Sequence, residues 1–112
     1  MTDVPAITVQ DAYALLNADE AVLIDVREAD EYAVARIDGA VLAPLSEMPA
    51  IWDTLDLPAG KTVIVQCLVG GRSGRVCAYV GPTGPHGQPV VNLTGGIKAW
   101  SEAGLPVIHG EG

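Results

Sequence analysis

Apolar and polar positions follow one another along the chain in short blocks of two kinds. Continuous apolar runs at 21–26 and 62–66, and a shorter one at 90–93, have the length and β-branched content of strands buried on both faces. A further brief strand is expected at 40–42, before Pro44. Segments with polar starts predict helices at 8–17, 28–34, 47–55, 73–80 and 97–103. Alternating strands and helices predict an α/β fold of three layers, with a central, mostly parallel sheet and helices on both faces.

The ends of these segments carry local signals. Thr8 begins a capping-box-like start, and Ser46 is a candidate cap for the helix at 47–55, in which Pro49 falls early. Gly104 suits the stop of the last helix. The stretch 81–89 is rich in glycine and proline and reads as a loop. One hypothesis is that this loop forms a lip over a binding pocket, and the alternative is mere sequence variation.

Composition sets limits on domain number and partners. The chain has 112 residues, 49% of them hydrophobic, so we expect a single domain over 1–112 with its core at about 7–108. A net charge of −8 leaves no basic stripe, which argues against nucleic acid and against anionic membranes as partners. Met1–Pro5 lacks the basic start and apolar run of a signal peptide. No segment resembles a coiled-coil seam, so a monomer is expected.

The two cysteines, Cys67 and Cys77, are too few for a disulfide framework. A reducing, cytoplasmic setting with a free Cys67 thiol fits best. Cys77 lies within a predicted helix and is expected to pack in the core, with a resolving thiol for Cys67 as the alternative. His86 is expected in a solvated loop and His109 in the tail, and neither has a neighbouring ligand at metal spacing. We therefore expect no metal and no cofactor.

Cys67 opens the segment that carries the strongest chemical signal. It follows the strand at 62–66 and precedes a turn with Gly70 and Gly71, then Arg72, Ser73 and a helix. A strand, a tight loop and a helix N-terminus collect backbone N–H groups that stabilise negative charge. Thiolate is the reactive form of cysteine, and it is favoured at such a place beside a cation. The segment predicts an activated nucleophile in an anion-binding cradle.

The chain resembles a single rhodanese domain, the family of persulfide-forming sulfurtransferases. Three blocks in register carry the resemblance: an N-terminal signature, the active-site loop and a C-terminal signature. Their residues are 23–28 with 31–32 and 36–40, then 67–73, and finally 93–100 with 104–107. Any one block would be a weak signal, but three in the right order are specific.

The resemblance implies that Cys67 attacks the outer sulfur of a donor, such as thiosulfate, and becomes a persulfide. The acceptor would be cyanide or another thiophile, and a protein persulfide or thiol is a further candidate partner. The loop residues Leu68, Val69, Gly70, Gly71 and Arg72 would turn their N–H groups toward the sulfur. Arg72 would add a cation that steers an anionic donor or pins the loop. The supporting residues are Asp25, Arg27 and Ser73, the first two expected to hold loops together rather than touch substrate.

Leu68 and Val69 depart from the basic or polar residue that many active relatives carry directly after the cysteine. This departure weakens the case for thiosulfate and leaves a persulfide donor open. A non-catalytic or regulatory binding module of the same fold is one alternative function. A cysteine-dependent phosphatase or arsenate reductase is another, but those loops place five residues between cysteine and arginine, whereas four separate Cys67 from Arg72. The tighter ring suits a sulfur atom better than a tetrahedral phosphate.

Overall fold

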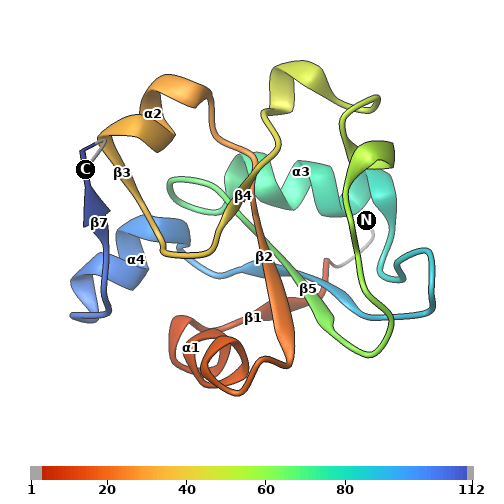
Figure 1. The fold of residues 1–112 in the computed structure, drawn as a ribbon, viewed down its shortest axis with the longest axis horizontal. Helices are drawn as coiled ribbons and strands as arrows, with labels where there is room; N and C mark the ends of the chain where they lie inside the picture. The colour runs from red at the N-terminus through yellow and green to blue at the C-terminus, as the bar shows by residue number, and fades with distance from the viewer. Residues whose placement is uncertain (1–3, 111–112) are drawn as a thin grey trace.

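The computed structural model describes residues 4–110 and is built around one parallel sheet (Figure 1). Its strands lie in the order β1-β6-β5-β2-β4, and every neighbouring pair is parallel. Their bounds are β1 Ala6–Ile7, β2 Ala21–Asp25, β4 Val41–Leu42, β5 Thr62–Gln66 and β6 Val90–Leu93. The predicted α/β class and parallel sheet are confirmed. Of the Met1–Pro5 segment, residues 1–3 lie outside the described part of the chain.

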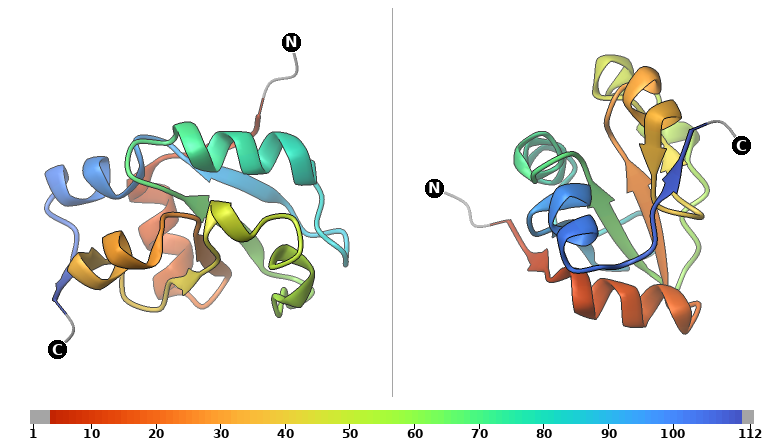
Figure 2. Two further views of the ribbon diagram at one scale, coloured as in Figure 1. Left: turned by 90° about the horizontal axis from the view of Figure 1, so that it is seen from above. Right: turned by 90° about the vertical axis from the view of Figure 1, so that its left-hand side faces the viewer.

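Helices cover both faces of this sheet (Figure 2). One face packs against α1 (Val9–Asn17) and α4 (Gly96–Glu102), whose Ala12 and Trp100 share a core with Leu23 and Ile64. The other face packs against α3 (Gly71–Val80). Its Val76 and Cys77 share a second core with the residues of β2 and β5 that adjoin Leu23 and Ile64 in the sequence. Successive strand side chains point to opposite faces, so the continuous apolar runs supply both cores at once.

The predicted helix starts follow from local chemistry. Thr8 caps α1, and its Oγ1 accepts a hydrogen bond from Asp11 N. Glu28 caps α2 (Ala29–Val34) in a capping box with Glu31. The helices α3 and α4 begin at glycines, two residues and one residue earlier than predicted. Glycine at a helix start gives no apolar signal, which explains the late predicted boundaries.

Three short strands were not predicted. The pair β3 (Ala35–Arg36) and β7 (Ile108–His109) forms a separate antiparallel ribbon, and β1 lies at the edge of the main sheet. Strands of two residues are too short for an alternating pattern to be visible. Their pairing depends on segments distant in the chain, as when Arg36 pairs with Ile108.

The predicted helix at 47–55 is wrong. This segment instead forms two 3-10 turns, η1 (Leu45–Glu47) and η2 (Trp52–Thr54). Met48 between them is extended, with φ −76° and ψ 149°. Proline disfavours the helical conformation in the residue before it, so Pro49 prevents Met48 from continuing a helix. Apolar side chains of this segment still pack against the core on the α3 face.

The hypothesis that 81–89 forms a lip over the pocket is also wrong. The segment does form a loop, which leads into the amino end of β6, and Val63 N at the start of β5 donates to Pro89 O. Cys67 follows the carboxyl end of β5, at the opposite edge of the parallel sheet. The buried Gln88 ties the loop down through a hydrogen bond from its Nε2 to Leu57 O.

Two features are absent from residues 4–110, a membrane-spanning helix and a cluster of metal ligands. No helix in this range is long and apolar enough to cross a membrane. The same range contains no group of three or more His, Cys, Asp or Glu side chains placed to hold a metal ion.

Candidate active site

Cys67 is the first residue after β5, at the point where the chain turns into α3. Its side chain is almost fully enclosed, with 1% of the residue exposed. Gly70 N donates to Cys67 Sγ at 3.1 Å, and Gly70 has φ +105°, a conformation that side chains other than glycine's rarely allow. The loop therefore curls its backbone over the sulfur, which is the cradle that the spacing predicts.

The N-terminus of α4 binds the carbonyl groups of this loop on the side away from the sulfur. Ile97 N donates to Cys67 O and Lys98 N donates to Leu68 O, both at 3.0 Å. The approach is so close that a Cβ on Gly96 would lie 2.5 Å from each of these two carbonyl oxygens. With their carbonyls bound on the outer side, the loop peptides are free to present N–H groups on the inner side. The cradle is thus fixed by a helix that begins 29 residues after the cysteine.

Ser73 lies on the inner side of the cradle, in the first turn of α3 and fully buried. Its Oγ is 3.3 Å from Cys67 Sγ and 2.5 Å from Asn92 Oδ1 on β6. The Nδ2 group of Asn92 donates to Gly70 O at 3.1 Å. Asn92 therefore contacts Gly70 and Ser73, two of the residues whose polar groups lie against the sulfur.

Burial of Cys67 by itself would raise the pKa of its thiol. Hydrogen bonds outweigh this effect: the hydroxyl and backbone N–H of Ser73 and the backbone N–H groups of Gly70 and Val69 all favour the charged sulfur. The pKa of Cys67 consequently lies below its ordinary value. A lowered pKa increases the fraction of reactive thiolate at neutral pH.

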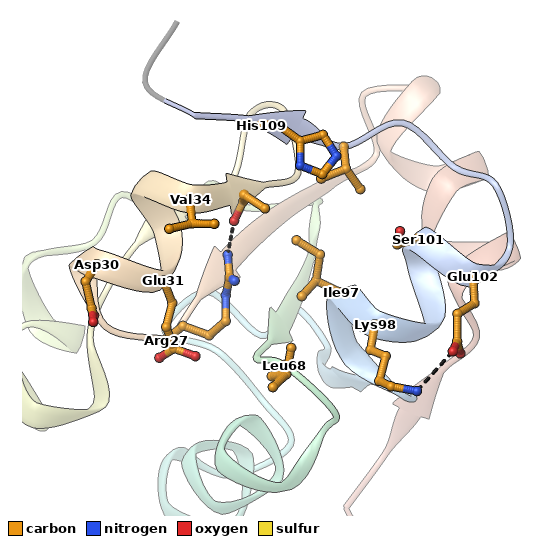
Figure 3. Close-up of a pocket in the computed structure, with 12 residues that line it drawn as sticks. Arg27, Asp30, Glu31, Val34, Leu68, Ile97, Lys98, Ser101, Glu102 and His109 are labelled. Atoms are coloured by element: carbon orange, nitrogen blue, oxygen red, sulfur yellow. Dashed lines mark hydrogen bonds and ion pairs between the residues drawn. The ribbon is translucent and has the colours of Figure 1, made fainter.

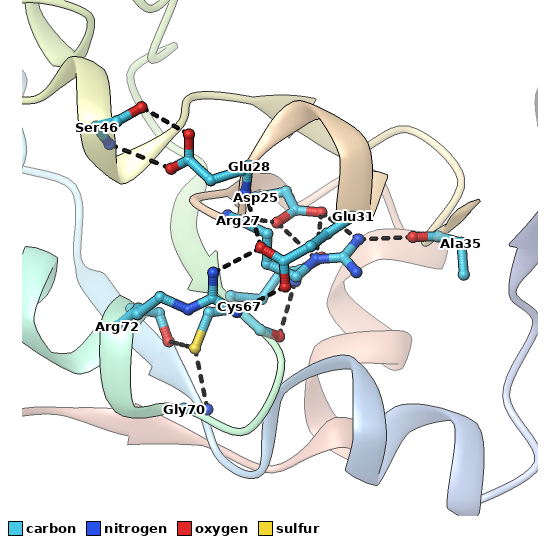
Figure 4. A network of polar contacts seen from close by, with 11 residues as sticks. Asp25, Arg27, Glu28, Glu31, Ala35, Ser46, Cys67, Gly70 and Arg72 are labelled. Atoms are coloured by element: carbon cyan, nitrogen blue, oxygen red, sulfur yellow. Dashed lines mark hydrogen bonds and ion pairs between the residues drawn. The ribbon is translucent and has the colours of Figure 1, made fainter. Parts of the chain in front are cut away.

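Arg72 does not point freely into solvent but forms a bidentate ion pair with Glu31 of α2 (Figure 4). The Nη1–Oε1 and Nη2–Oε2 distances are 2.7 and 2.8 Å. The hydrogen bonds from Arg72 hold the pKa of Glu31 at about 2, and Glu31 in turn raises the pKa of Arg72. Of the two roles considered for Arg72, pinning the loop therefore has direct structural support.

Asp25 and Arg27 form a second, buried ion pair at the carboxyl end of β2. Arg27 Nη2 lies 2.8 Å from Asp25 Oδ2 and also donates to Ala35 O at 2.7 Å. These contacts join β2 to the end of α2, as Figure 4 shows. Their geometry is that of residues which hold loops together. Both arginines near Cys67 are thus electrically balanced by a carboxylate.

An open groove of about 650 Å³ begins beside the loop (Figure 3). It runs between α2 and α4, with Leu68 at one end and His109 on β7 across it. Leu68 and Val69 are 44% and 57% exposed. The expectation that His109 is merely a tail residue is therefore wrong, since its strand lines the groove. His86 does lie in the 81–89 loop, exposed.

Cys77 lies in the core on the α3 face, in the same apolar cluster as Cys67. Both cysteines are free thiols. Burial raises the pKa of Cys77 to about 12, so it stays protonated at neutral pH. Trp100 is likewise a core residue, and Trp52 packs against the second core.

Three residues of this site carried no assigned role in the sequence: Glu31, Asn92 and Gly96. Asn92 could have been noticed as an amide within the apolar run Val90–Leu93, since a polar side chain in a buried strand needs partners. The roles of Glu31 and Gly96 depend on contacts to the cysteine loop across 41 residues and about 28 residues of chain, and no local pattern reports them.

The chain is similar to known proteins over most of its length. A family profile for the rhodanese-like domain matches residues 8–103. The chain is 35% identical over 98 residues to a sulfurtransferase of Allochromatium vinosum, with 88% of each chain covered. It is 32% identical over 101 residues to the thiosulfate sulfurtransferase GlpE of Actinobacillus succinogenes, covering 90% of this chain and 87% of that one.

Solved structures lead to the same assignment. The crystal structure of a rhodanese-related protein from Thermoplasma volcanium superposes with a TM-score of 0.79 at 29% identity. That match covers 93% of this chain and 97% of the other. The fold, the matched profile and the sulfurtransferase relatives agree, and this chain belongs to the rhodanese-like domain family.

Proposed function

We propose that the protein is a sulfurtransferase that carries a sulfane sulfur as a persulfide on Cys67. The observation that carries the proposal is the hydrogen-bonded cradle around Cys67 Sγ, in which Gly70 N lies 3.1 Å from a thiol of lowered pKa. Fixed N–H donors in an enclosed site stabilise charge on sulfur without the reorganisation that water would need. The sulfurtransferase names of the relatives point to the same class of reaction.

In the first half-reaction the Cys67 thiolate attacks the outer sulfur of the donor. A bond forms between Sγ and that sulfur, and the bond to the rest of the donor breaks. The donor leaves with the electron pair, as sulfite from thiosulfate or as a thiolate from a persulfide. In the second half-reaction an acceptor, cyanide or a thiol, attacks the outer sulfur and the Cys67 thiolate leaves. No general base is needed in this step, because the attacking group is the thiolate, which is already nucleophilic.

For the donor we favour a persulfide on a small thiol or a protein over thiosulfate. Thiosulfate is a dianion, and it would approach a chain of net charge −8. The cations at the site do not offset this repulsion, since Arg72 is paired with Glu31 and Arg27 with Asp25. The groove beside Leu68 gives room for the remainder of a larger donor.

The carboxylates paired with the two arginines beside Cys67 do not supply the acid that a phosphatase needs for its leaving alcohol. Glu31 is paired with Arg72, and Asp25 is paired with Arg27. With a pKa of about 2, Glu31 stays ionised at neutral pH and cannot act as an acid. A regulatory binding module would not need a Cys67 of lowered pKa.

Intact-protein mass spectrometry tests the proposal directly. The protein is treated separately with thiosulfate, cysteine persulfide and glutathione persulfide, then desalted. We expect a mass gain of one sulfur atom, absent in Cys67→Ser and retained in the matched control Cys77→Ser. If none of the three donors increases the intact mass, the sulfurtransferase proposal is wrong. Parallel assays of thiocyanate formation and phosphate-ester hydrolysis separate the two enzyme classes.

A further inference from the structure

Asn92 contacts the cradle at two points, and its amide can satisfy both in only one orientation. The carbonyl of Gly70 is an acceptor, so the Asn92 group that faces it at 3.1 Å must be the NH₂. The other end of the amide, Oδ1, is then the atom 2.5 Å from Ser73 Oγ. Because Oδ1 accepts only, the Ser73 hydroxyl must donate its proton there.

A hydroxyl has a single proton, and Ser73 has two acceptors for it. While the proton points to Asn92 Oδ1, Ser73 Oγ faces Cys67 Sγ across 3.3 Å with a lone pair. That arrangement suits a neutral thiol, whose S–H donates to the lone pair. A thiolate has no proton to give and attracts the Ser73 proton instead. If the Ser73 hydroxyl turns its proton to the sulfur, Ser73 Oγ and Asn92 Oδ1 face each other at 2.5 Å with no proton between them. Such an unsatisfied contact costs free energy.

We propose that Asn92 is a positioning residue for sulfur transfer: by competing for the single proton of Ser73, it sets how strongly that hydroxyl stabilises a charged Cys67 Sγ. The inference rests on the proposed persulfide chemistry. When the sulfane sulfur attaches, the negative charge moves from Sγ to the outer sulfur, and the Ser73 proton can return to Asn92. Asn92 therefore favours the sulfur-loaded cysteine over the bare thiolate.

Other titratable groups near the cradle do not form this contact. Arg72 and Cys77 interact with the charge of Cys67 through space. The remaining ones are Glu31, which is paired with Arg72, and the Asp25–Arg27 pair at the end of β2. None of them hydrogen-bonds to Asn92 in the part of the chain that the structure describes. The effect of Asn92 should therefore depend on Ser73 and on little else.

A double-mutant cycle tests this dependence. Asn92→Leu keeps the branched shape of the side chain but removes both hydrogen bonds, and it is made with Ser73 and in a Ser73→Ala background. The readout is the pKa of Cys67, from the pH dependence of thiolate ultraviolet absorbance after subtraction of Cys67→Ser. Titration does not require sulfur transfer, so this result is independent of whether the persulfide proposal holds.

The Asn92→Leu change shifts the pKa of Cys67 by one amount when Ser73 is present and by another in the Ser73→Ala background. The first shift should be more negative than the second by about one pH unit. Equal effects in the two backgrounds would overturn the proposal and leave Asn92 a support for Gly70 alone. Circular dichroism verifies folding. If Asn92→Leu is unfolded, Asn92→Asp serves instead: its carboxylate binds the Ser73 proton more firmly, so the pKa should rise, and by less in the Ser73→Ala background.

Discussion

The guanidinium of Arg72 and the carboxylate of Glu31 meet through two parallel hydrogen bonds, of 2.7 and 2.8 Å, that join the cysteine loop to α2. Glu31 also accepts a hydrogen bond from Glu28 N, so the same carboxylate caps its own helix. Glu31 therefore both fixes the position of the Arg72 guanidinium and neutralises its positive charge. For the proposed sulfur transfer, we expect this pairing to reduce the attraction of the site for an anionic donor.

Replacing Glu31 by glutamine should free that positive charge. Glutamine can still accept the hydrogen bond from Glu28 N, so the capping box is retained. We expect kcat/KM for thiosulfate to rise about fivefold at low salt, with the gain lost at high salt. Asp19→Asn is the matched control, since it breaks the exposed Lys61–Asp19 pair, which does not line the groove, with the same change in net charge. Equal rates for the two variants would mean that Arg72 does not steer the donor.

The ion pair should also make stability depend on pH in the acid range. Glu31 has a folded-state pKa of about 2 against an ordinary value of 4.5, so its contribution is complete above pH 4.5. It is lost as the pH falls from 4.5 toward 2, because the unfolded chain then binds a proton that the folded chain does not. Urea denaturation should show a steeper fall in the free energy of unfolding for the wild type than for Glu31→Gln. Parallel pH curves for the two proteins would contradict the assignment.

Leu68 should limit the use of an anionic donor. It is 44% exposed at the end of the groove beside Cys67, so an arginine there would reach solvent without disturbing the core. Leu68→Arg should raise kcat/KM for thiosulfate about fivefold, equivalent to about 1 kcal/mol. Tyr79→Arg, on an exposed part of α3, adds the same charge as a control. A decrease in thiosulfate turnover for Leu68→Arg would refute this explanation of donor choice.

Gly96→Ala should disrupt the cysteine loop. The new Cβ would meet the carbonyl oxygens of Cys67 and Leu68 at 2.5 Å, and backbone atoms cannot move aside cheaply. We expect a loss of about 3 kcal/mol in unfolding free energy and loss of persulfide formation. Gly60→Ala is the control, since Gly60 has a similar positive φ and no atom within 4 Å of an added Cβ. Its cost should be about 1 kcal/mol, from backbone strain alone, with sulfur loading unchanged.

Cys77→Ala should leave the chemistry intact. The pKa of about 12 keeps Cys77 protonated, and its place in the core makes it a packing residue. We expect a stability loss of about 1 kcal/mol and an unchanged rate of persulfide formation on Cys67. Mild peroxide treatment of the wild type should not remove two hydrogens from the intact mass. A Cys67–Cys77 disulfide detected by that measurement would restore the resolving-thiol alternative.

The parts of the fold that could be predicted are those whose signals are local. The runs at 62–66 and 90–93 coincide with β5 and β6, because strands buried on both faces are mostly apolar. The helix predicted at 47–55 was wrong. Its apolar residues have helical spacing, but Pro49 excludes the helical conformation at Met48. The ribbon of β3 and β7 depends on a pairing between Arg36 and Ile108, which no local pattern encodes.

In the candidate site, too, the features with local signals could be predicted and those that depend on distant segments could not. The cradle around Cys67 followed from the order of strand, glycine turn and helix. The neutralisation of Arg72 did not, because Glu31 reaches it from another helix. The competition of Asn92 for the Ser73 proton depends on which neighbouring strand lies beside β5, and that order is a property of the folded sheet.

The anchoring of the loop by α4 has a consequence for the chain during its synthesis. A chain made only as far as Val80 already contains Cys67, Gly70 and Ser73, but it lacks Asn92 and the N–H groups of Ile97 and Lys98 that orient the loop. We expect the cysteine of such a chain to behave as an ordinary thiol, because nothing orients the loop around it. Its reactive setting should form only after the last quarter of the chain has been added and has packed.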